Sequence, residues 1–187
     1  MNETSVLMAG FGGQGMLLAG KVLAQAAMRC GLEVSWLPSY GPEMRGGTAN
    51  VIVCLSAEPI ASPLVSRPQA LVAMNLPSLD RFEERVAPRG TIVVNATLVA
   101  RAAARADCRV VRVDTRSLAQ AAGNERAANF VLLGAYVGAT EAVAAAAVEE
   151  AIAEEFRDGK EKHVATSVAA FRAGLEAGRR APDEVHA

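Results

Sequence analysis

The sequence contains few of the residues that usually identify an active site or a nucleic-acid-binding surface. Its 187 residues include two histidines, three cysteines and 4% aromatic residues. The 19 Lys and Arg are balanced by 20 Asp and Glu, so the formal net charge is −1. Nucleic-acid-binding domains usually carry a basic surface and aromatic side chains that stack on bases. The composition therefore argues against a nucleic-acid partner.

Cysteine usage and the length of the apolar runs exclude further classes of protein. Cys30, Cys54 and Cys108 are widely spaced and odd in number, whereas disulfide frameworks and cysteine-ligated metal clusters need paired or grouped residues. We expect Cys30 and Cys54 to be small buried apolar residues. No uncharged apolar stretch reaches the roughly 18 residues of a membrane span, and no signal peptide is visible at the N-terminus. These features favour a cytoplasmic protein that binds no metal and no membrane.

The apolar pattern alternates between strands and helices early in the chain and becomes helical after Thr115. A stripe of period 3.6 predicts a helix over 15–30, and Gly31 ends it. The pattern predicts a three-layer α/β/α fold with a mostly parallel, or mixed, sheet and a C-terminal helical portion. We expect one domain over 1–178 and a polar, frayed tail over 179–187. The expected strands are 5–10, 32–37, 48–56, 70–75, 90–98 and 108–114.

A glycine-rich turn lies between the first expected strand and the first expected helix. Its residues are Gly10, Phe11, Gly12, Gly13, Gln14 and Gly15, which match G-x-G-x-x-G. Glycines allow close backbone approach, and a helix N-terminus attracts anions. A dinucleotide site would also need an acidic residue at the end of the second strand, where this chain has Pro38 and Ser39. The interpretations that stay open are a tight structural turn, a dinucleotide site that lacks this second feature, a site for another phosphate, and part of a site shared with a partner.

A loop of low charge follows the second expected strand. Between Val34 and Val65 the only charged residues are Glu43, Arg45 and Glu58. Tyr, Met and Arg are enriched at protein interfaces, and glycines permit close approach. The loop is therefore either a partner-facing surface or a well-packed internal segment. Its residues are Ser39, Tyr40, Gly41, Pro42, Glu43, Met44, Arg45, Gly46 and Gly47.

Several single residues have simpler interpretations. Asp114 ends a strand ahead of an expected helix and reads as its N-cap. Asn124, Arg126 and Asn129 share one helical region, which could contact a partner or form a packed or solvated face. His163 is expected on the surface of a helix.

Three segments in order resemble the gamma subunit of 2-oxoacid:ferredoxin oxidoreductases. They read GFGGQGMLLAGKVLAQAA, PSYGPEMRGGTANVIVCLS and PIASPLVSRPQALVAMNLPSLDRF. The later stretches NERAANFVLLGAY and AFRAGLEAG are also similar to this family, so the resemblance covers residues 4 to 178. The SYGPEMRGG form looks more like subunits of 2-oxoglutarate or branched-chain 2-ketoacid enzymes than of pyruvate enzymes. Gln69 stands where the family usually has aspartate.

This resemblance implies a function that belongs to a complex. The complex converts a 2-oxoacid and coenzyme A to an acyl-CoA, CO2 and reduced ferredoxin. Thiamine diphosphate with magnesium would lie between the alpha and beta subunits, and the [4Fe-4S] clusters in the beta and ferredoxin-like delta subunits. Ferredoxin would be the electron acceptor. The gamma chain would bind no cofactor alone and would contribute no catalytic residue. The glycine turn and the low-charge loop would face the partners and the active site.

Two alternatives stay open at this point. The chain could be a free-standing dinucleotide-binding oxidoreductase that uses the turn from Gly10 to Gly15. It could instead be a scaffold whose glycine turn binds nothing. An exposed partner surface would also allow the isolated chain to form a homodimer.

Overall fold

The computed structural model describes residues 3–39, 48–157 and 161–182. Among these, no helix is long and apolar enough to cross a membrane. The strands are β1 (Thr4–Phe11), β2 (Glu33–Ser39), β3 (Thr48–Ser56), β4 (Ala70–Ala73), β5 (Thr91–Asn95) and β6 (Arg109–Val113). The α-helices are α1 (Met16–Arg29), α2 (Leu76–Phe82), α3 (Thr115–Ala121), α4 (Ala128–Thr140), α5 (Ala145–Glu155) and α6 (Val164–Arg180). Three short 3₁₀ helices are η1 (Glu83–Arg85), η2 (Glu125–Ala127) and η3 (Glu161–His163).

The strands form one mixed sheet in the order β2-β3-β1-β4-β5-β6. The neighbours β1, β4, β5 and β6 pair in parallel, whereas β3 is antiparallel to both β1 and β2. The sequence-based expectation of a mostly parallel or mixed sheet is confirmed. β3 lies between β1 and β2, so the first two strands of the chain are not neighbours.

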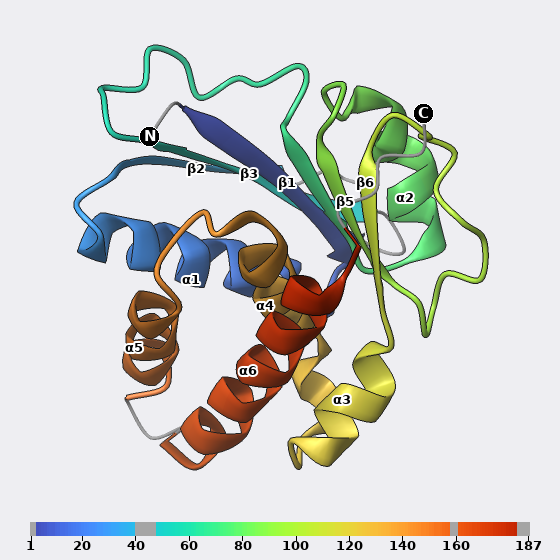
Figure 1. Cartoon of the computed structure of the whole chain (residues 1–187). Coiled ribbons are helices and arrows are strands. Elements are labelled where there is room, and N and C mark those ends of the chain that lie inside the picture. Colours follow the sequence, from blue (N-terminus) through green and yellow to red (C-terminus); the bar gives the residue numbers. More distant parts are fainter. Residues whose placement is uncertain (1–2, 40–47, 158–160, 183–187) are drawn as a thin grey trace.

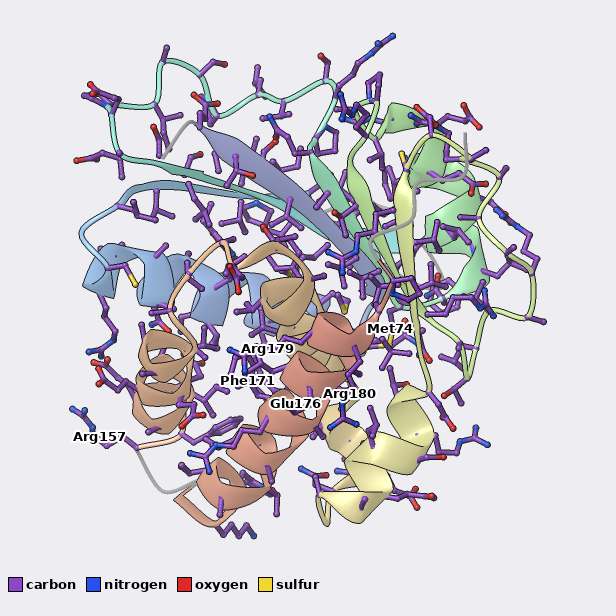
Figure 2. All side chains as sticks on the ribbon, viewed as in Figure 1. Met74, Arg157, Phe171, Glu176, Arg179 and Arg180 are labelled. Carbon is purple, nitrogen blue, oxygen red and sulfur yellow. The ribbon has the colours of Figure 1, made fainter. Side chains whose placement is uncertain are left out.

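Helices cover both faces of the sheet, as Figure 1 shows, with α1, α4, α5 and α6 on one face and α2 on the other. Alternation along β1 explains why both layers can pack on it. Val6 and Met8 join the core beneath α1 and α4, whereas Leu7 and Ala9 join the smaller core beneath α2. Figure 2 shows side chains filling the space between the sheet and the larger helical layer.

The helices α4 and α6 cross with glycine on both sides of the contact. A Cβ atom built on Gly134 would lie 2.0 Å from the carbonyl oxygen of Phe171, and one on Gly174 would lie 1.9 Å from that of Val131. A Cβ atom built on Gly138 or on Gly178 would likewise lie 2.2 Å from a carbonyl oxygen of the opposite helix. The two backbones therefore touch directly, and no larger residue fits at these positions.

Two expectations about single residues can be compared with the structure. Cys54 is buried in β3 as expected, and burial raises the pKa of its thiol. Cys30 is exposed, contrary to expectation, because it is the C-cap residue of α1, where the chain turns away at Gly31. Gln69 takes a local structural role, since its Oε1 accepts a hydrogen bond from the Ser5 backbone at 2.8 Å.

The C-terminal helix extends past the expected end of the domain. α6 includes Arg179 and Arg180, the first two residues of the expected tail. Arg109 donates hydrogen bonds to the carbonyl oxygens of Ala181 and Pro182. Residues 183–187 lie outside the described residues, so fraying there remains a prediction.

Candidate functional site

Both predicted partner-facing motifs are attached to one edge of the sheet. β1, β4, β5 and β6 end at this edge, and β2 ends there too because it and β1 are both antiparallel to β3. The glycine turn follows β1. The low-charge loop begins at Ser39, opposite Asn50, and ends before Thr48, which is the register partner of Phe11. We call this side of the sheet the carboxyl edge. The loop residues 40–47 themselves lie outside the described residues, so only the two anchors of the loop are placed.

The backbone of the turn explains most of its glycines. Gly13 has φ +88° and Gly15 has φ +76°, a left-handed conformation that side chains other than glycine rarely adopt. Gly10 is needed for space, because a Cβ there would lie 2.9 Å from Oε1 of Gln14 and 3.0 Å from Cβ of Met74. Gly12 is exposed in the turn. Gly15 is also the N-cap of α1, whose first turn contains no acidic residue and receives no side-chain cap.

Three amide side chains hold the turn. Gln14 folds back so that its Oε1 accepts hydrogen bonds from the backbone of Phe11 at 2.7 Å and from Nδ2 of Asn75 at 2.8 Å. Nδ2 of Asn129, on α4, donates to the carbonyl oxygen of Gly15 at 3.2 Å. The turn is thus tied to the β4–α2 connection on one side and to α4 on the other.

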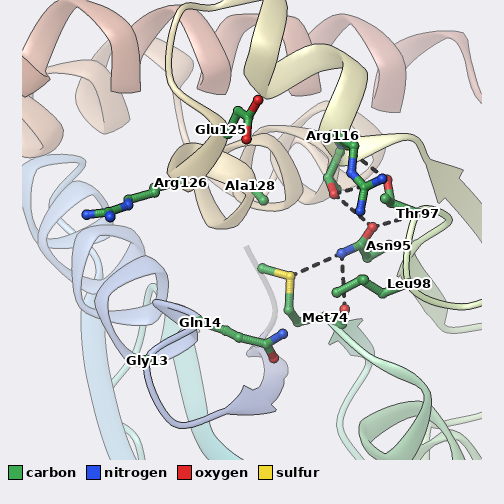
Figure 3. A pocket seen from close by; sticks show the side chains of 11 residues that line it. Gly13, Gln14, Met74, Asn95, Thr97, Leu98, Arg116, Glu125, Arg126 and Ala128 are labelled. Atoms are coloured by element: carbon green, nitrogen blue, oxygen red, sulfur yellow. Dashed lines mark hydrogen bonds between the residues drawn. The ribbon is translucent and has the colours of Figure 1, made fainter.

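A cavity of about 480 Å³ opens beside the turn at the carboxyl edge. Figure 3 shows Gln14 reaching from the turn toward Met74, with Asn95, Thr97 and Arg116 gathered on the opposite wall. Ligand sites of open α/β sheets occur outside the carboxyl ends of the strands, which is where this cavity lies. The cavity is lined by Gly13, Gln14, Met74, Asn95, Thr97, Leu98, Thr115, Arg116, Glu125, Arg126 and Ala128.

One wall of the cavity is a connected hydrogen-bond network. Asn95 is buried at the end of β5; its Nδ2 donates to the carbonyl oxygen of Met74 at 3.1 Å, and its Oδ1 accepts from the hydroxyl of Thr115 at 2.8 Å. Thr97 donates to Asp114 at 2.9 Å. Asp114 is the N-cap of α3, as expected from the sequence. Hydrogen bonds from Ser117 and then from Thr97 lower the pKa of this carboxyl group.

Charged and apolar side chains remain exposed around the cavity. Arg116 and Arg126 line it, and within the described part of the chain neither guanidinium group has an ion pair. Large apolar side chains follow three adjacent parallel strands at this edge. They are Phe11 at the end of β1, Leu76 after β4 and Leu98 after β5, with exposed fractions of 36%, 37% and 46%. Exposed apolar groups interspersed with arginine are typical of a protein-binding surface.

A second hollow of about 350 Å³ also borders the turn. Gly13, Gln14 and Arg126 line both hollows. The position of the turn therefore affects the shape of both.

The dinucleotide alternative finds little support in this arrangement. In dinucleotide-binding folds the second strand lies beside the first and ends in the residue that holds the ribose. Here β3 separates β2 from β1, and β2 ends in Pro38 and Ser39. The sequence pattern alone could not reveal this insertion.

Sequence reasoning singled out the turn and the low-charge loop but missed the residues that support them. Asn75 follows the short buried strand β4 and Asn95 ends the short buried strand β5. Asn129 lies in the region that the sequence predicts to contact a partner or to form a packed or solvated face. The structure shows Asn129 to be 4% exposed and bonded to the turn. A useful signal was available: polar residues directly after successive parallel strands gather at one edge of a sheet.

Comparisons with known proteins agree on one protein family. A family model described as pyruvate ferredoxin/flavodoxin oxidoreductase matches residues 5–177. Ketoisovalerate oxidoreductase subunit VorA of Methanothermobacter thermautotrophicus is 40% identical over 93% of this chain and 36% of its own length. The chain spans about a third of the length of the VorA relatives that it matches. The 2-oxoglutarate synthase subunit KorC of the same organism is 36% identical, over 91% of this chain and 93% of its own length.

A solved structure agrees with the sequence relatives. The gamma subunit of a keto/oxoacid ferredoxin oxidoreductase from Geobacter sulfurreducens superposes with a TM-score of 0.80 at 28% identity, covering 94% of this chain and 98% of that one. The similarity thus extends over nearly the whole chain. The chain belongs to the pyruvate ferredoxin/flavodoxin oxidoreductase family.

Proposed function

We propose that this chain is the gamma component of a 2-oxoacid:ferredoxin oxidoreductase. The complex would oxidatively decarboxylate a 2-oxoacid with coenzyme A to give an acyl-CoA, CO2 and reduced ferredoxin. The observation that carries this proposal is the match to KorC, which covers nearly all of both chains. The family match over residues 5–177 and the likeness to a solved gamma subunit support it.

Within the complex, the carboxyl edge would be the surface that faces the partners and the active site. The glycine turn and the low-charge loop, both attached to this edge, would shape and cap the access of substrate and coenzyme A. The exposed Phe11, Leu76 and Leu98 support a docking role for the edge, as do Arg116 and Arg126, whose guanidinium groups form no ion pair with the described residues. Away from this edge, Trp36 in the middle of β2 and Leu64 in the β3–β4 connection are also exposed, at 37% and 75%, and they add apolar surface elsewhere on the chain.

The cofactors of the reaction would be held by the partner chains. Thiamine diphosphate with magnesium supplies decarboxylation chemistry and [4Fe-4S] clusters carry single electrons. A cluster needs several converging thiolates. In the part of the chain that the structure describes, Cys30 is at the end of α1, Cys54 in β3 and Cys108 before β6, and no group of three or more His, Cys, Asp or Glu could hold a metal. These donors do not fit a cluster.

The proposed partners are the alpha, beta and ferredoxin-like delta subunits, in the cytoplasm, with ferredoxin as the acceptor. The proposed substrate is 2-oxoglutarate, with a branched-chain 2-oxoacid next. The SYGPEMRGG motif supports both, and the two curated relatives named above carry these two substrates in their names. Selectivity would rest mostly on the partner chains.

Affinity purification of the tagged chain from its native cell tests the assignment. We expect thiamine-binding and iron–sulfur chains to copurify, and the preparation to reduce an electron acceptor when given coenzyme A and 2-oxoglutarate. Tight binding of NAD or flavin by the isolated chain would refute the proposal and favour the dinucleotide alternative. A panel of 2-oxoacids then identifies the substrate.

The variant Arg45→Ala tests the role of the low-charge loop in the reconstituted complex. An arginine in such a loop can face a carboxylate or phosphate, so we expect weaker assembly or a higher KM for the 2-oxoacid or coenzyme A. Unchanged assembly together with unchanged kinetics for both compounds would contradict the capping role.

A further inference from the structure

We propose that Asn75 and Asn129 are positioning residues that fix the glycine turn for its work in the assembled complex. This inference rests on the proposed function and names which residues of the chain set the geometry of the carboxyl edge. The two asparagines come from β4–α2 and from α4, and each is almost fully buried, at 4% exposure. Neither lies within the glycine motif.

Asn129 fixes the end of the turn where α1 begins. Its Nδ2 donates to the carbonyl oxygen of Gly15, which also accepts the backbone bond of Ala19 at 3.0 Å. A Cβ on Gly15 would lie 2.7 Å from Nδ2 of Asn129 and 3.0 Å from its Cγ. The amide and the turn are therefore in direct contact, and Gly15 cannot move toward α4.

Asn75 fixes the other end through Gln14. Its Oδ1 accepts from the backbone of Ser78 at 2.9 Å and caps α2, which leaves Nδ2 to donate to Oε1 of Gln14. The same Oε1 accepts from the backbone of Phe11. One oxygen thus joins the end of β1, the glycine turn and the start of α2. Rotation of the Gln14 amide would present its NH2 group to the N–H of Phe11, so the arrangement works only with a donor at position 75.

These contacts also link the turn to the low-charge loop. Phe11, whose backbone is held by Gln14, is the register partner of Thr48, where the chain re-enters the sheet after the loop. A turn that is displaced at Phe11 therefore displaces the anchor of the loop. Because the reacting groups would belong to other chains, displacement should act on access and binding more than on the chemical step.

The matched variants change the donor at Asn75 and leave the helix cap in place. Asn75→Asp keeps an acceptor for Ser78 and replaces the donor to Gln14 with a carboxylate oxygen, which repels Oε1. Gln69→Ala is the control, because Gln69 is also an amide bonded to the backbone of β1, but at Ser5, at the opposite end of the strand. Asn129→Asp makes the corresponding change at Gly15.

The experiment measures assembly, thermal midpoint, kcat and KM of complexes reconstituted with each variant. We expect Asn75→Asp and Asn129→Asp to assemble and to lose about tenfold in kcat/KM, mainly through KM for the 2-oxoacid or coenzyme A, since small misplacements of positioning groups have effects of this size or larger. Gln69→Ala should keep the wild-type KM. The double variant Asn75→Asp/Gln14→Ala should lose less than the sum of the two single losses, because both substitutions remove the bond between Asn75 and Gln14.

Several outcomes would overturn the inference. Wild-type KM and kcat in both asparagine variants would do so and would leave the proposed function standing. Losses that follow only the folded fraction, with KM unchanged, would reduce the asparagines to structural residues. If Asn75→Asp fails to fold, Gln14→Ala, which leaves the α2 cap untouched, must give the KM increase instead. Absence of 2-oxoacid turnover in the wild-type complex would overturn the proposed function itself.

Discussion

Glycine is used in two different ways in this chain, and the contrast separates packing from function. At the crossing of α4 and α6, Gly134, Gly138, Gly174 and Gly178 have ordinary helical backbone, and each lies against the backbone of the other helix. In the glycine turn, Gly13 and Gly15 have positive φ values, and the Cβ of a residue at 13 would point into open space. The crossing needs small residues for lack of room, whereas the turn needs glycine at position 13 for conformation and leaves open space beside it.

This difference shows which glycines contribute to the stability of the isolated chain. A buried contact between backbones contributes to stability whether or not a partner is present. Open space at an exposed turn contributes nothing to the isolated chain. The space at Gly13 is therefore where we expect a partner or a ligand, and substitutions in the two regions should separate stability from assembly.

The largest loss of stability is expected for Gly174→Ala in the crossing. The new Cβ would lie 1.9 Å from the carbonyl oxygen of Val131, so the helices must separate. We expect the free energy of unfolding to fall by about 3 kcal/mol or more, measured by urea denaturation of the isolated chain. Glu176→Ala, on the exposed side of the same helix, is the control and should change it by less than about 0.5 kcal/mol. A tolerated Gly174→Ala would contradict the direct backbone contact.

An intermediate loss is expected for Gly15→Ala, where the two uses of glycine overlap. The residue has φ +76°, and its Cβ would meet Asn129. The left-handed conformation alone costs about 1–2 kcal/mol, so we expect about 2 kcal/mol in the same denaturation measurement. Asn129→Ala in the Gly15→Ala background should recover part of this loss, because it removes the colliding atoms. If the free energy of unfolding does not recover, the left-handed backbone alone accounts for the loss.

A smaller loss of stability, together with a large loss of assembly, is expected for Gly13→Arg. The residue has φ +88° and nothing within 4 Å of a new Cβ, so Gly13→Ala and Gly13→Arg should cost the isolated chain the same, about 1–2 kcal/mol. In the complex the larger side chain should weaken assembly or turnover at least tenfold more than alanine does. Binding of the partner subunits measured by titration checks this, and equal behaviour of the two variants would mean that nothing covers the turn.

The smallest effect is expected from the pH dependence at Asp114. Hydrogen bonds from Ser117 and Thr97 lower the pKa of this carboxyl group in the folded state. Its contribution is therefore complete above the unfolded pKa of about 3.9 and is lost as the pH falls through the lower folded value. Urea midpoints at pH 7 and pH 3 should differ less for Asp114→Asn than for the wild type. An identical pH dependence in both proteins would show that Asp114 does not contribute to the change of stability with pH.

The sequence was sufficient for the layers and the strands, because apolar alternation and stripes report directly on burial. The expected strand 48–56 coincides with β3, and the expected helix 15–30 coincides with α1 to within a residue at each end. The exchange of order that places β3 between β1 and β2 depends on pairing between distant segments, which local patterns do not encode. Exposure of Cys30 was missed for a similar reason, since periodicity does not show where a helix stops being covered.

Only part of the candidate site could be predicted from the sequence. The turn was visible because positive φ and close approach restrict the residue type to glycine, and Asp114 was visible because capping is local. The contact of Asn129 with Gly15 joins residues 114 positions apart, so only the folded chain reveals it. The glycine crossing could have been recognised, since Gly134 and Gly138, and Gly174 and Gly178, each show the G-x-x-x-G spacing.

The most direct test of the central claim is turnover measured with and without this chain. The proposed alpha, beta and delta partner subunits are purified together, and coenzyme A-dependent oxidation of 2-oxoglutarate and of branched-chain 2-oxoacids is followed before and after adding the purified chain. We predict that adding it raises turnover at least tenfold and that Gly13→Arg fails to do so. Full turnover by the partner subunits alone would contradict a required role for the carboxyl edge.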